Sequence, residues 1–384
     1  MANNNENKVL NVPHLRFPEF SGEWKEEQLD SIATLSKGIG ISKEQLSEDG
    51  EPCILYGELY TKYKSEIIKH VESKTDIDSS KLKRSKANDV IIPCSGETAV
   101  DIATARCVPF DNILLGGDLN VISLHKYDGA FMSYQLNGKR KYDIARVAQG
   151  VSVVHLYGEH LKAIKTYNPS LPEQQKIAEL LSLIDERIAT QNKIIDKLQS
   201  LIKGISNKIF ATIQGIEYRM GNIVTISNGN SNVQDAVTES KDGLYPFFDR
   251  SENIKYLPTF LFDKEAIIYP GEGAEFMPRY FRGKFALHQR CYAIFDFKEI
   301  INAQFLYFYL KTQNSYFVRN AVGSTVPSLR LDTFQKLKVI IPPKKIQHSV
   351  SLYLSSMEQK CNVEKDILQK LLKQKQYLLR QMFI

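Results

Sequence analysis

The chain has 384 residues, which is long enough for two domains that each bury a core of their own. Hydrophobic residues make up 43% and charged residues 24%, the balance of a soluble globular protein, and no apolar run approaches the roughly 18 residues that span a bilayer. The net charge of +6 favours an anionic partner such as a nucleic acid, although many soluble enzymes share it. The first residues show no basic start followed by an apolar stretch, so we expect a cytoplasmic protein with no membrane partner.

The cysteines and histidines show no metal-binding or disulfide pattern. The five cysteines never form a CxxC pair, which predicts buried free thiols rather than a zinc knuckle or a disulfide framework. The seven histidines include no HExxH pair, and His155 and His160 stand on a predicted loop and helix start. We therefore expect neither a metal ion nor a cofactor in this chain.

The sequence contains two diverged copies of one module, in tandem. GVSVVHLYGEHLKAIKTYNPSLPEQQKIA, from Gly150, matches GSTVPSLRLDTFQKLKVIIPPKKIQHSVS, from Gly323, at an offset of 173 residues. FMSYQL matches FLYFYL at an offset of 174, and DVIIPCSGE matches KEAIIYPGE at 175. Near the front, LDSIATLSKG matches MGNIVTISNG at 191. The first copy is therefore longer, by about sixteen residues, somewhere between Gly38 and Asp89.

Each copy consists of a mixed region followed by a long helix. Short β-type runs such as DVIIP, NVISL, AIIYP and CYAIF are broken by glycine-containing turns, and helical stretches such as FLYFYLKTQ lie between them. The long helix of each copy starts after a proline, a favoured residue at helix N-termini. We predict an α+β fold with an N-terminal segment (1–20), a first globular α/β module (21–168), a first helix (169–213), a second module (214–341) and a second helix (342–384).

Apolar residues recur along both predicted helices in alternating steps of three and four, as in a coiled coil. A lone helix of this kind also packs commonly on its own domain. Since this chain has two such helices of equal length, we predict that they pair as an antiparallel intramolecular coiled coil with a pseudo-twofold axis. The seam residues are Ile177, Leu181, Ile184, Ile188, Gln191, Ile195, Leu198, Ile202, Val350, Leu354, Met357, Cys361, Glu364, Leu368, Leu371 and Leu378.

The polar seam residues Gln191 and Glu364 occupy equivalent positions near the middle of the two helices. In an antiparallel pair of equal helices they are expected to face one another. The helix from Ile177 to Ile209 is about 48 Å long at 1.5 Å per residue. That length corresponds to about 14 base pairs of B-DNA, so two modules at opposite ends of such a rod suit a bipartite site with an unread gap.

The chain resembles the specificity subunits of type I restriction-modification systems, from about Phe17 to Ile384. The resemblance is carried by FPEFSGEW, by the Gly-x-x-Val-x-x-Leu segments at Gly150 and Gly323, and by the helix start PSLPEQQKIAELLSLIDERI. The second helix start, PPKKIQHSVS, departs from the family's proline-glutamate-glutamine form. The resemblance implies two target recognition domains that each read half of a DNA target, and a helical spacer that sets the gap.

The resemblance also implies partner subunits that supply the chemistry. Two methyltransferase subunits would dock along the spacer, restriction and translocase subunits would join them, and S-adenosylmethionine, ATP and Mg would be bound only by those partners. This chain would be non-catalytic by itself. Two other classes stay open from the residues alone: an enzyme with an unrecognised site, and a scaffold whose modules bind protein rather than DNA.

Catalytic motifs are absent from the sequence. The string nearest to an adenine methyltransferase loop, Asn168-Pro169-Ser170-Leu171, lacks the second proline and the aromatic residue, and it lies at a predicted helix start. The chain has no GxxxxGK[ST] loop. Pro18-Glu19 and Glu23-Trp24-Lys25 resemble a nuclease motif, but they stand too close together to place carboxylates from two strands around one metal ion.

Candidate DNA-reading residues lie in loops that correspond between the copies but differ in chemistry. Each loop alone is also compatible with an ordinary turn, and the basic and aromatic stretch from Arg279 to Lys284 with a simple hairpin. Arginine, glutamine and carboxylate side chains are the groups that read base edges in the major groove. The candidates are Tyr56, Glu58, Ser95, Glu97, Thr98, Asp118, Arg250, Glu272, Arg279, Tyr280, Arg282, Lys284, His288, Gln289 and Arg290.

Overall fold

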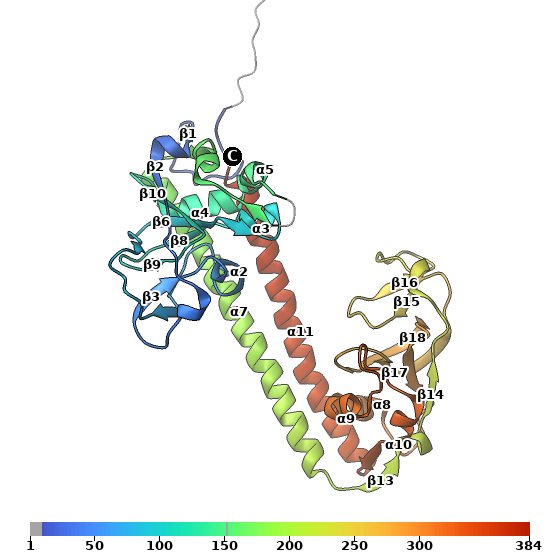
Figure 1. Ribbon diagram of the computed structural model, residues 1–384. Coiled ribbons are helices and arrows are strands. Elements are labelled where there is room, and N and C mark those ends of the chain that lie inside the picture. The colour runs from blue at the N-terminus through green and yellow to red at the C-terminus, as the bar shows by residue number, and fades with distance from the viewer. Residues whose placement is uncertain (1–9, 151–152) are drawn as a thin grey trace, which may run out of the picture. The chain divides into compact units, whose positions relative to one another are not determined.

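The computed structural model of the protein describes residues 10–150 and 153–384 (Figure 1). The chain divides into two compact units. The first unit contains the residues up to Asn192 together with Ile367–Ile384, and the second contains Lys193–Asp366. Each unit therefore consists of one globular module and a stretch of both long helices.

The first module is built on a four-stranded sheet and a smaller second sheet. The order of the larger sheet is β2-β10-β6-β8, and that of the smaller sheet is β4-β3-β9-β5. Val90, Ile92 and Ile122 of the larger sheet pack against Met132 and Leu136 of a helix that covers it. The strands are β1 (Lys25–Gln28), β2 (Ala33–Lys37), β3 (Glu51–Ile54), β4 (Ser73–Thr75), β5 (Lys83–Arg84), β6 (Asp89–Pro93), β7 (Ser95–Gly96), β8 (Arg106–Val108), β9 (Leu114–Leu115), β10 (Leu119–Leu124), β11 (Val154–His155) and β12 (Lys165–Asn168). The helices are α1 (Leu29–Ile32), η1 (Lys43–Gln45), α2 (Glu58–Thr61), α3 (Ala99–Ile102), α4 (Gly129–Asn137), α5 (Lys141–Val147) and α6 (Gly158–Lys162).

The second module joins the corresponding strands into one six-stranded sheet of order β14-β19-β17-β18-β15-β16. Tyr269 and Ile294 of this sheet pack against Phe305 and Phe308, which lie on the helix that corresponds to α4. The strands are β13 (Ile216–Arg219), β14 (Thr225–Asn228), β15 (Tyr245–Phe248), β16 (Lys255–Leu257), β17 (Phe262–Pro270), β18 (Arg279–Leu287), β19 (Cys291–Phe295) and β20 (Lys338–Ile341). The helices are η2 (Met220–Asn222), η3 (Val233–Asp235), α8 (Ala303–Lys311), α9 (Asn314–Asn320) and α10 (Leu331–Lys336).

The predicted repeat is present in the hydrogen bonds as well as in the order of the strands. In the first unit, the amide of Gln174 accepts a hydrogen bond from the backbone of Asp128 at 2.9 Å and donates one to the carbonyl of Pro169 at 2.8 Å. In the second unit, Gln347 bonds the backbones of Asn302 and Pro342, both at 2.8 Å. We call this pair of bonds the glutamine clamp. It joins the start of α4 or α8 to the start of the long helix that follows the module.

The long helices are α7 (Leu171–Thr212) and α11 (Lys344–Gln381). In the first unit, Ile177 and Leu181 near the start of α7 pack with Met382 at the end of α11. In the second unit, Ile209 near the end of α7 packs with Leu354 in the first half of α11. The two helices are therefore antiparallel (Figure 1). All sixteen predicted seam residues are buried or half-buried, and several of them contact the adjoining module as well as the partner helix.

The extra length of the first copy lies largely between β3 and β4. The connection there spans residues 55–72, whereas residues 249–254 suffice between the corresponding strands β15 and β16. An arginine bonds a backbone carbonyl of this connection in each module. Arg106, which is buried, donates to the carbonyl of Tyr63 at 2.9 Å, and Arg279, which is half-buried, donates to the carbonyl of Asp249.

The cysteines are all buried and free, as the sequence predicted. Burial raises the pKa of Cys107 to about 12, so its thiol stays protonated at neutral pH. Among the helices of residues 10–150 and 153–384, none is both long enough and apolar enough to cross a bilayer.

Candidate DNA interface

In each module, four connections that follow strands lie together at one edge, and we call this the loop edge of the module. Three backbone hydrogen bonds hold the loop edge of the first module: Gly38 to Leu119 at 2.9 Å, Ile39 to Leu115 at 3.0 Å, and Gly116 to Ile54 at 2.9 Å. The same three bonds occur in the second module: Gly229 to Cys291 at 3.2 Å, Asn230 to Leu287 at 3.1 Å, and His288 to Phe248 at 2.9 Å. The loop edges are residues 38–40, 55–58, 94–98 and 116–118 in the first module, and 229–231, 249–252, 271–273 and 288–290 in the second.

Gly38 and Gly229 make this arrangement possible because the backbones approach closely there. A Cβ atom at Gly38 would lie 1.9 Å from the carbonyl oxygen of Gly116, and one at Gly229 would lie 2.0 Å from that of Leu287. Neither distance leaves room for a side chain. The glycines therefore fix the backbone of the loop edge, while the side chains of the loops are free to differ between the modules.

The loop edge of the second module brings together five of the predicted residues. Arg290 forms an ion pair with Glu272 across two loops, at 2.7 Å. Arg250, Gln289 and Arg290 are exposed, and His288 is half-buried beside them. Burial lowers the pKa of His288, which favours the neutral imidazole at neutral pH. The surface thus offers two guanidinium groups, a carboxylate, an amide and an imidazole, which are the groups that read base edges.

The stretch from Arg279 to Lys284 lies along β18 and divides into two kinds of residue. Arg279 is half-buried, stacks over Phe248 with 5.3 Å to the ring centroid, and holds the carbonyl of Asp249. The hydroxyl of Tyr280 donates to Glu265. Arg282 and Lys284 are exposed and face solvent along the hairpin. We leave Arg279 out of the proposed reading surface because its guanidinium group already has a structural partner.

The loop edge of the first module contains a hollow of about 710 Å³, to which the predicted residues Tyr56, Ser95 and Glu97 contribute. The hydroxyl of Tyr60, also in its wall, donates to the carbonyl of Ser95 at 3.0 Å. Asp118 is exposed nearby, and its carbonyl accepts from the backbone of Cys94 at 2.7 Å. The structure therefore brings these four predicted residues to one edge.

Two other predicted residues of the first module have structural partners. Glu58 is buried, accepts from the backbone of Leu55 at 2.9 Å and pairs with Lys62 at 2.7 Å. Thr98 caps helix α3 by accepting from the backbone of Asp101 at 3.1 Å. We leave Glu58 out of the proposed reading surface, because a carboxylate held in the interior does not reach a base.

The structure adds polar residues that the sequence reasoning did not select. Ser231 lies on the loop edge of the second module, and Asn228 is the last residue of β14, directly before that edge. The amide of Asn228 donates to the carbonyl of Gln289 at 3.3 Å. In the first module the side chain of Tyr157 is exposed, and its ring centroid lies 5.8 Å from the Nζ atom of Lys37. The match between LDSIATLSKG and MGNIVTISNG could have identified residues 228–231, because it places Gly38 and Gly229 at equivalent strand ends.

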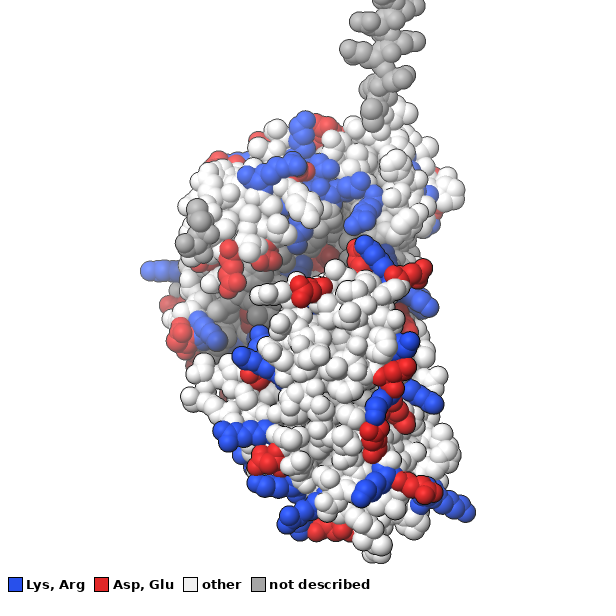
Figure 2. Space-filling model, turned by 90° about the vertical axis from the view of Figure 1, so that its right-hand side faces the viewer, with Lys and Arg blue, Asp and Glu red and all other residues white. Residues whose placement is uncertain are grey.

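Charged side chains are unevenly spread over the second module. In the lower half of Figure 2, lysine and arginine side chains lie mainly along the margins, together with acidic ones, and the centre is largely uncharged. On the drawn face, positive charge is thus distributed at the rim rather than gathered into one patch.

Asn168 and Pro169, which resemble part of a methyltransferase loop in the sequence, have structural roles. Asn168 lies in β12, where its amide donates to Thr166 at 3.0 Å, and Pro169 belongs to the glutamine clamp. Within residues 10–150 and 153–384, no group of three or more His, Cys, Asp or Glu side chains is placed to hold a metal ion.

Comparison with known proteins identifies the family. The family model described as the type I restriction modification DNA specificity domain matches residues 21–200 and again 216–373. The chain is 29% identical over 138 residues to the type I restriction enzyme EcoDI specificity subunit of Escherichia coli, and 27% identical over 164 residues to a type I specificity subunit of Mycoplasma pneumoniae. These segments cover 36% and 42% of this chain, and 30% and 44% of the two relatives.

Solved structures share the whole fold at low sequence identity. The S subunit of a type I restriction-modification system from M. genitalium superposes with a TM-score of 0.66 at 19% identity, over 97% of this chain and 99% of that one. A chain from a structural study of complex assembly in a type I system superposes with a TM-score of 0.55 at 15% identity, over 94% and 97%. With two matches of the family model that together span most of its length, the chain belongs to the type I restriction modification DNA specificity domain family.

Proposed function

We propose that the chain is the DNA-sequence-reading subunit of a type I restriction-modification complex. Each module reads one half of a bipartite target through its loop edge, and α7 and α11 set the unread gap between the halves. Two methyltransferase subunits dock along the helices, and restriction and translocase subunits join them. S-adenosylmethionine, ATP and Mg act in those partners, and this chain contributes binding and positioning alone.

The observation that carries the proposal is the duplicated loop edge. The same backbone bonds and an equivalent glycine, Gly38 or Gly229, hold it in each module, but its side chains differ at several of the predicted positions. Where the second module has Arg250 and Arg290, the first has Tyr56 and Asp118 near the matched positions. A constant frame with variable polar loops is the arrangement that lets two copies of one fold read different bases.

Apolar side chains on the helices support docking of protein subunits along them. Large apolar side chains that are exposed on a helix offer contact area to a protein subunit that docks along it. The exposed residues on α7 and α11 include Leu183, Leu201, Leu352, Tyr353, Val363, Leu372 and Tyr377.

Exchanging the first module tests the assignment of one half-site to each module. Replacing the residues up to Asn168 with those of a relative is expected to change only one half of the methylated sequence, because each loop edge is complete within its own module. Long-read sequencing of host DNA would map the methylated adenines. The reciprocal exchange of residues 214–341 is the matched control and should change only the other half. Changes in both halves after a single exchange would contradict the assignment.

Arg290 is expected to read a guanine in the second half-site. A bidentate arginine contributes about 1–3 kcal/mol of discrimination between bases, so R290A should relax one position by about five- to 150-fold while other positions keep their preference. Binding to a set of targets with single base changes, at fixed salt, measures this directly. K284A, at an exposed residue of the hairpin, is the control for a phosphate contact. If R290A instead weakens binding to all targets alike, and the affinity then depends less steeply on salt concentration, Arg290 contacts phosphate.

A further inference from the structure

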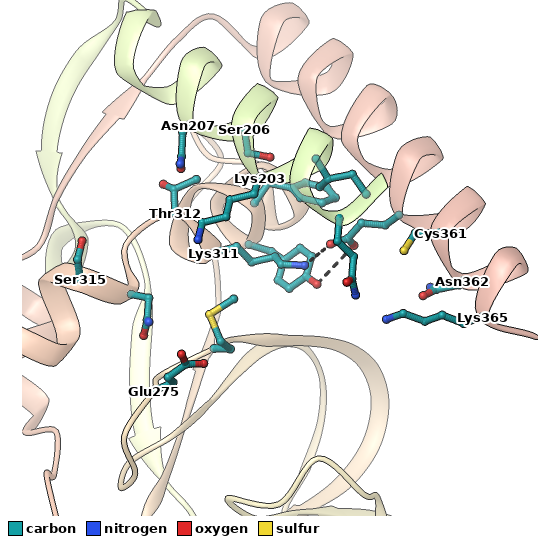
Figure 3. Close-up of a pocket in the computed structure, with 17 residues that line it drawn as sticks. Lys203, Ser206, Asn207, Glu275, Lys311, Thr312, Ser315, Cys361, Asn362 and Lys365 are labelled. Carbon is teal, nitrogen blue, oxygen red and sulfur yellow. Dashed lines mark hydrogen bonds and ion pairs between the residues drawn. The ribbon is translucent and has the colours of Figure 1, made fainter. Parts of the chain in front are cut away.

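The second unit contains a hollow of about 680 Å³, which we call the second-unit hollow, between α7, α11 and the module (Figure 3). Lys203, Lys365 and Cys361 line it from the two long helices, and Lys311 and Glu275 line it from the module. Its volume lies within the range of about 300–1,000 Å³ that is usual for binding sites. Nothing in the loop edges contributes to it, so reading DNA does not explain it.

In the first unit, a segment of the chain occupies the corresponding place. The connection between β3 and β4 packs Ser65–Lys69 against α7: Ser65 donates to Asp185 at 3.0 Å, and Lys69 pairs with Glu186 at 3.1 Å. Glu66 pairs with Lys375 of α11 at 2.5 Å. The hydroxyl of Ser133 on α4 donates to the backbone carbonyl of Glu66 at 3.0 Å.

The residues that hold this segment have equivalents in the wall of the second-unit hollow. Asp185 corresponds to Glu358 by the helix offset of 173, and Ser133 corresponds to Tyr307 by the α4 offset of 174. Both equivalents line the hollow. In the second module the connection between β15 and β16 is shorter and spans residues 249–254. Its first residue, Asp249, forms an ion pair with Lys255 of β16 at 2.7 Å, so the connection stays beside the sheet. The second-unit hollow is thus the counterpart of a place that the first module fills with its own chain.

The charges of the hollow favour an acidic occupant. Glu358 is already engaged by Lys311, which leaves Lys203 and Lys365, with Glu275, to meet an incoming group. Figure 3 shows the side chains of Lys203 and Lys365 directed toward the open space from the two helices. In the first unit it is a carboxylate, that of Glu66, which the segment presents to a lysine of the long helix.

We propose that the second-unit hollow binds a short acidic peptide segment of a methyltransferase subunit, which takes the place that Ser65–Lys69 fills in the first unit. The identity of that partner rests on the proposed function. The first unit supplies its own segment, so the two methyltransferase subunits dock by non-equivalent contacts. One of them depends on the hollow, and the other does not.

The stoichiometry of the complex tests the asymmetry. K203E/K365E should reduce the complex from two methyltransferase subunits per chain to one at concentrations that saturate the wild type, as measured by native mass spectrometry without DNA. The matched control K197E/K360E reverses two exposed lysines of the same helices outside the hollow and should keep two. Retention of both subunits by K203E/K365E, or loss of both, would overturn the proposal. Retention of both together with a shallower salt dependence of DNA binding would assign the lysines to phosphate.

A peptide probe separates the hollow from the proposed function. The probe is a labelled peptide of residues 64–69 in which both terminal lysines are replaced by glutamate, so that it carries the shape of the first unit's segment with acidic charge. Fluorescence anisotropy should show binding to the full chain, at least tenfold weaker binding to K203E/K365E, and unchanged binding to K197E/K360E. Equal binding to all three, or none to the wild type, would refute an acidic-peptide site. Peptide binding by a chain that assembles with no methyltransferase would uphold the site and refute the proposed function.

Discussion

Replacing Lys375 with methionine is expected to lower the free energy of unfolding of the first unit by about 3–5 kcal/mol at neutral pH. Lys375 lies 2.5 Å from Glu66 and 2.6 Å from Asp185, and all three side chains are almost fully enclosed. Burial lowers the pKa of Lys375, but the two carboxylates outweigh it and raise the pKa above its usual value. Methionine keeps the apolar part of the side chain, so the lost free energy of unfolding comes from the two carboxylates that no longer have a cation beside them. Urea unfolding measures it.

The pH dependence of K375M identifies the cause. Burial raises the pKa of Glu66, so ionised Glu66 costs stability as pH rises through and above its unfolded pKa of about 4.3. Without Lys375 this cost increases. The difference in free energy of unfolding between the wild type and K375M should therefore shrink as the pH is lowered from 8 toward 5. K373M, at an exposed lysine two residues earlier, is the control and should change stability by less than about 0.5 kcal/mol. A deficit that is the same at both pH values would mean that packing, not charge, is lost.

Inserting four residues into both long helices, next to Gln191 and next to Glu364, is expected to widen the unread gap by one or two base pairs. Four residues lengthen a helix by about 6 Å, nearly two base pairs, and come closest to one full turn, so the seam keeps its face. Both half-sites should stay the same because neither loop edge is altered. Mapping of methylated adenines in host DNA gives the gap and the half-sites together.

The control for this lengthening is the same insertion in α7 alone. It shifts the antiparallel seam out of register, and we expect loss of methylation rather than a new gap. An active variant with both insertions and an unchanged gap would contradict the helices as the ruler. The prediction that Gln191 faces Glu364 is tested separately, by a disulfide between cysteines introduced at the two positions.

The sequence predicted the features that repeat along the chain. The offset of 173 residues identified Gln174 and Gln347 as equivalent, and the structure gives them the same hydrogen bonds. The helical period identified α7 and α11, because a long seam is a local pattern that few other folds imitate. The offset also located the extra residues of the first copy, since a change of offset is visible without any structure.

Contacts between residues distant in the chain were beyond the reach of pattern reasoning. Lys375 stands four residues after the seam residue Leu371 and three before Leu378, where a charge is unfavourable. Only the structure shows that Glu66 from the first module accounts for it. The sequence around Glu58 is polar and contains a glycine, which predicts an exposed loop. Glu58 is nevertheless buried, and the hydroxyl of Ser73 and the backbone of Leu55 donate hydrogen bonds to its carboxylate. Which polar loop residues face solvent depends on such pairings, and single-residue chemistry does not reveal them.

The glutamine clamp has a consequence for how such chains can change by recombination. At each joint, and among the residues that the structure describes, the side chain of Gln174 or Gln347 bonds backbone atoms alone, in the adjoining module and at the helix start. Every non-proline residue supplies the same backbone groups, so the bonds of the glutamine place no demand on the side chains of a module that a crossover brings in before the helix. The glutamine of the helix can then form the same backbone bonds with the exchanged module as with the original one. At the clamp itself, genetic exchange of whole modules therefore needs no compensating mutation, whereas the pair of Glu66 with Lys375 in the first unit still has to be kept or replaced.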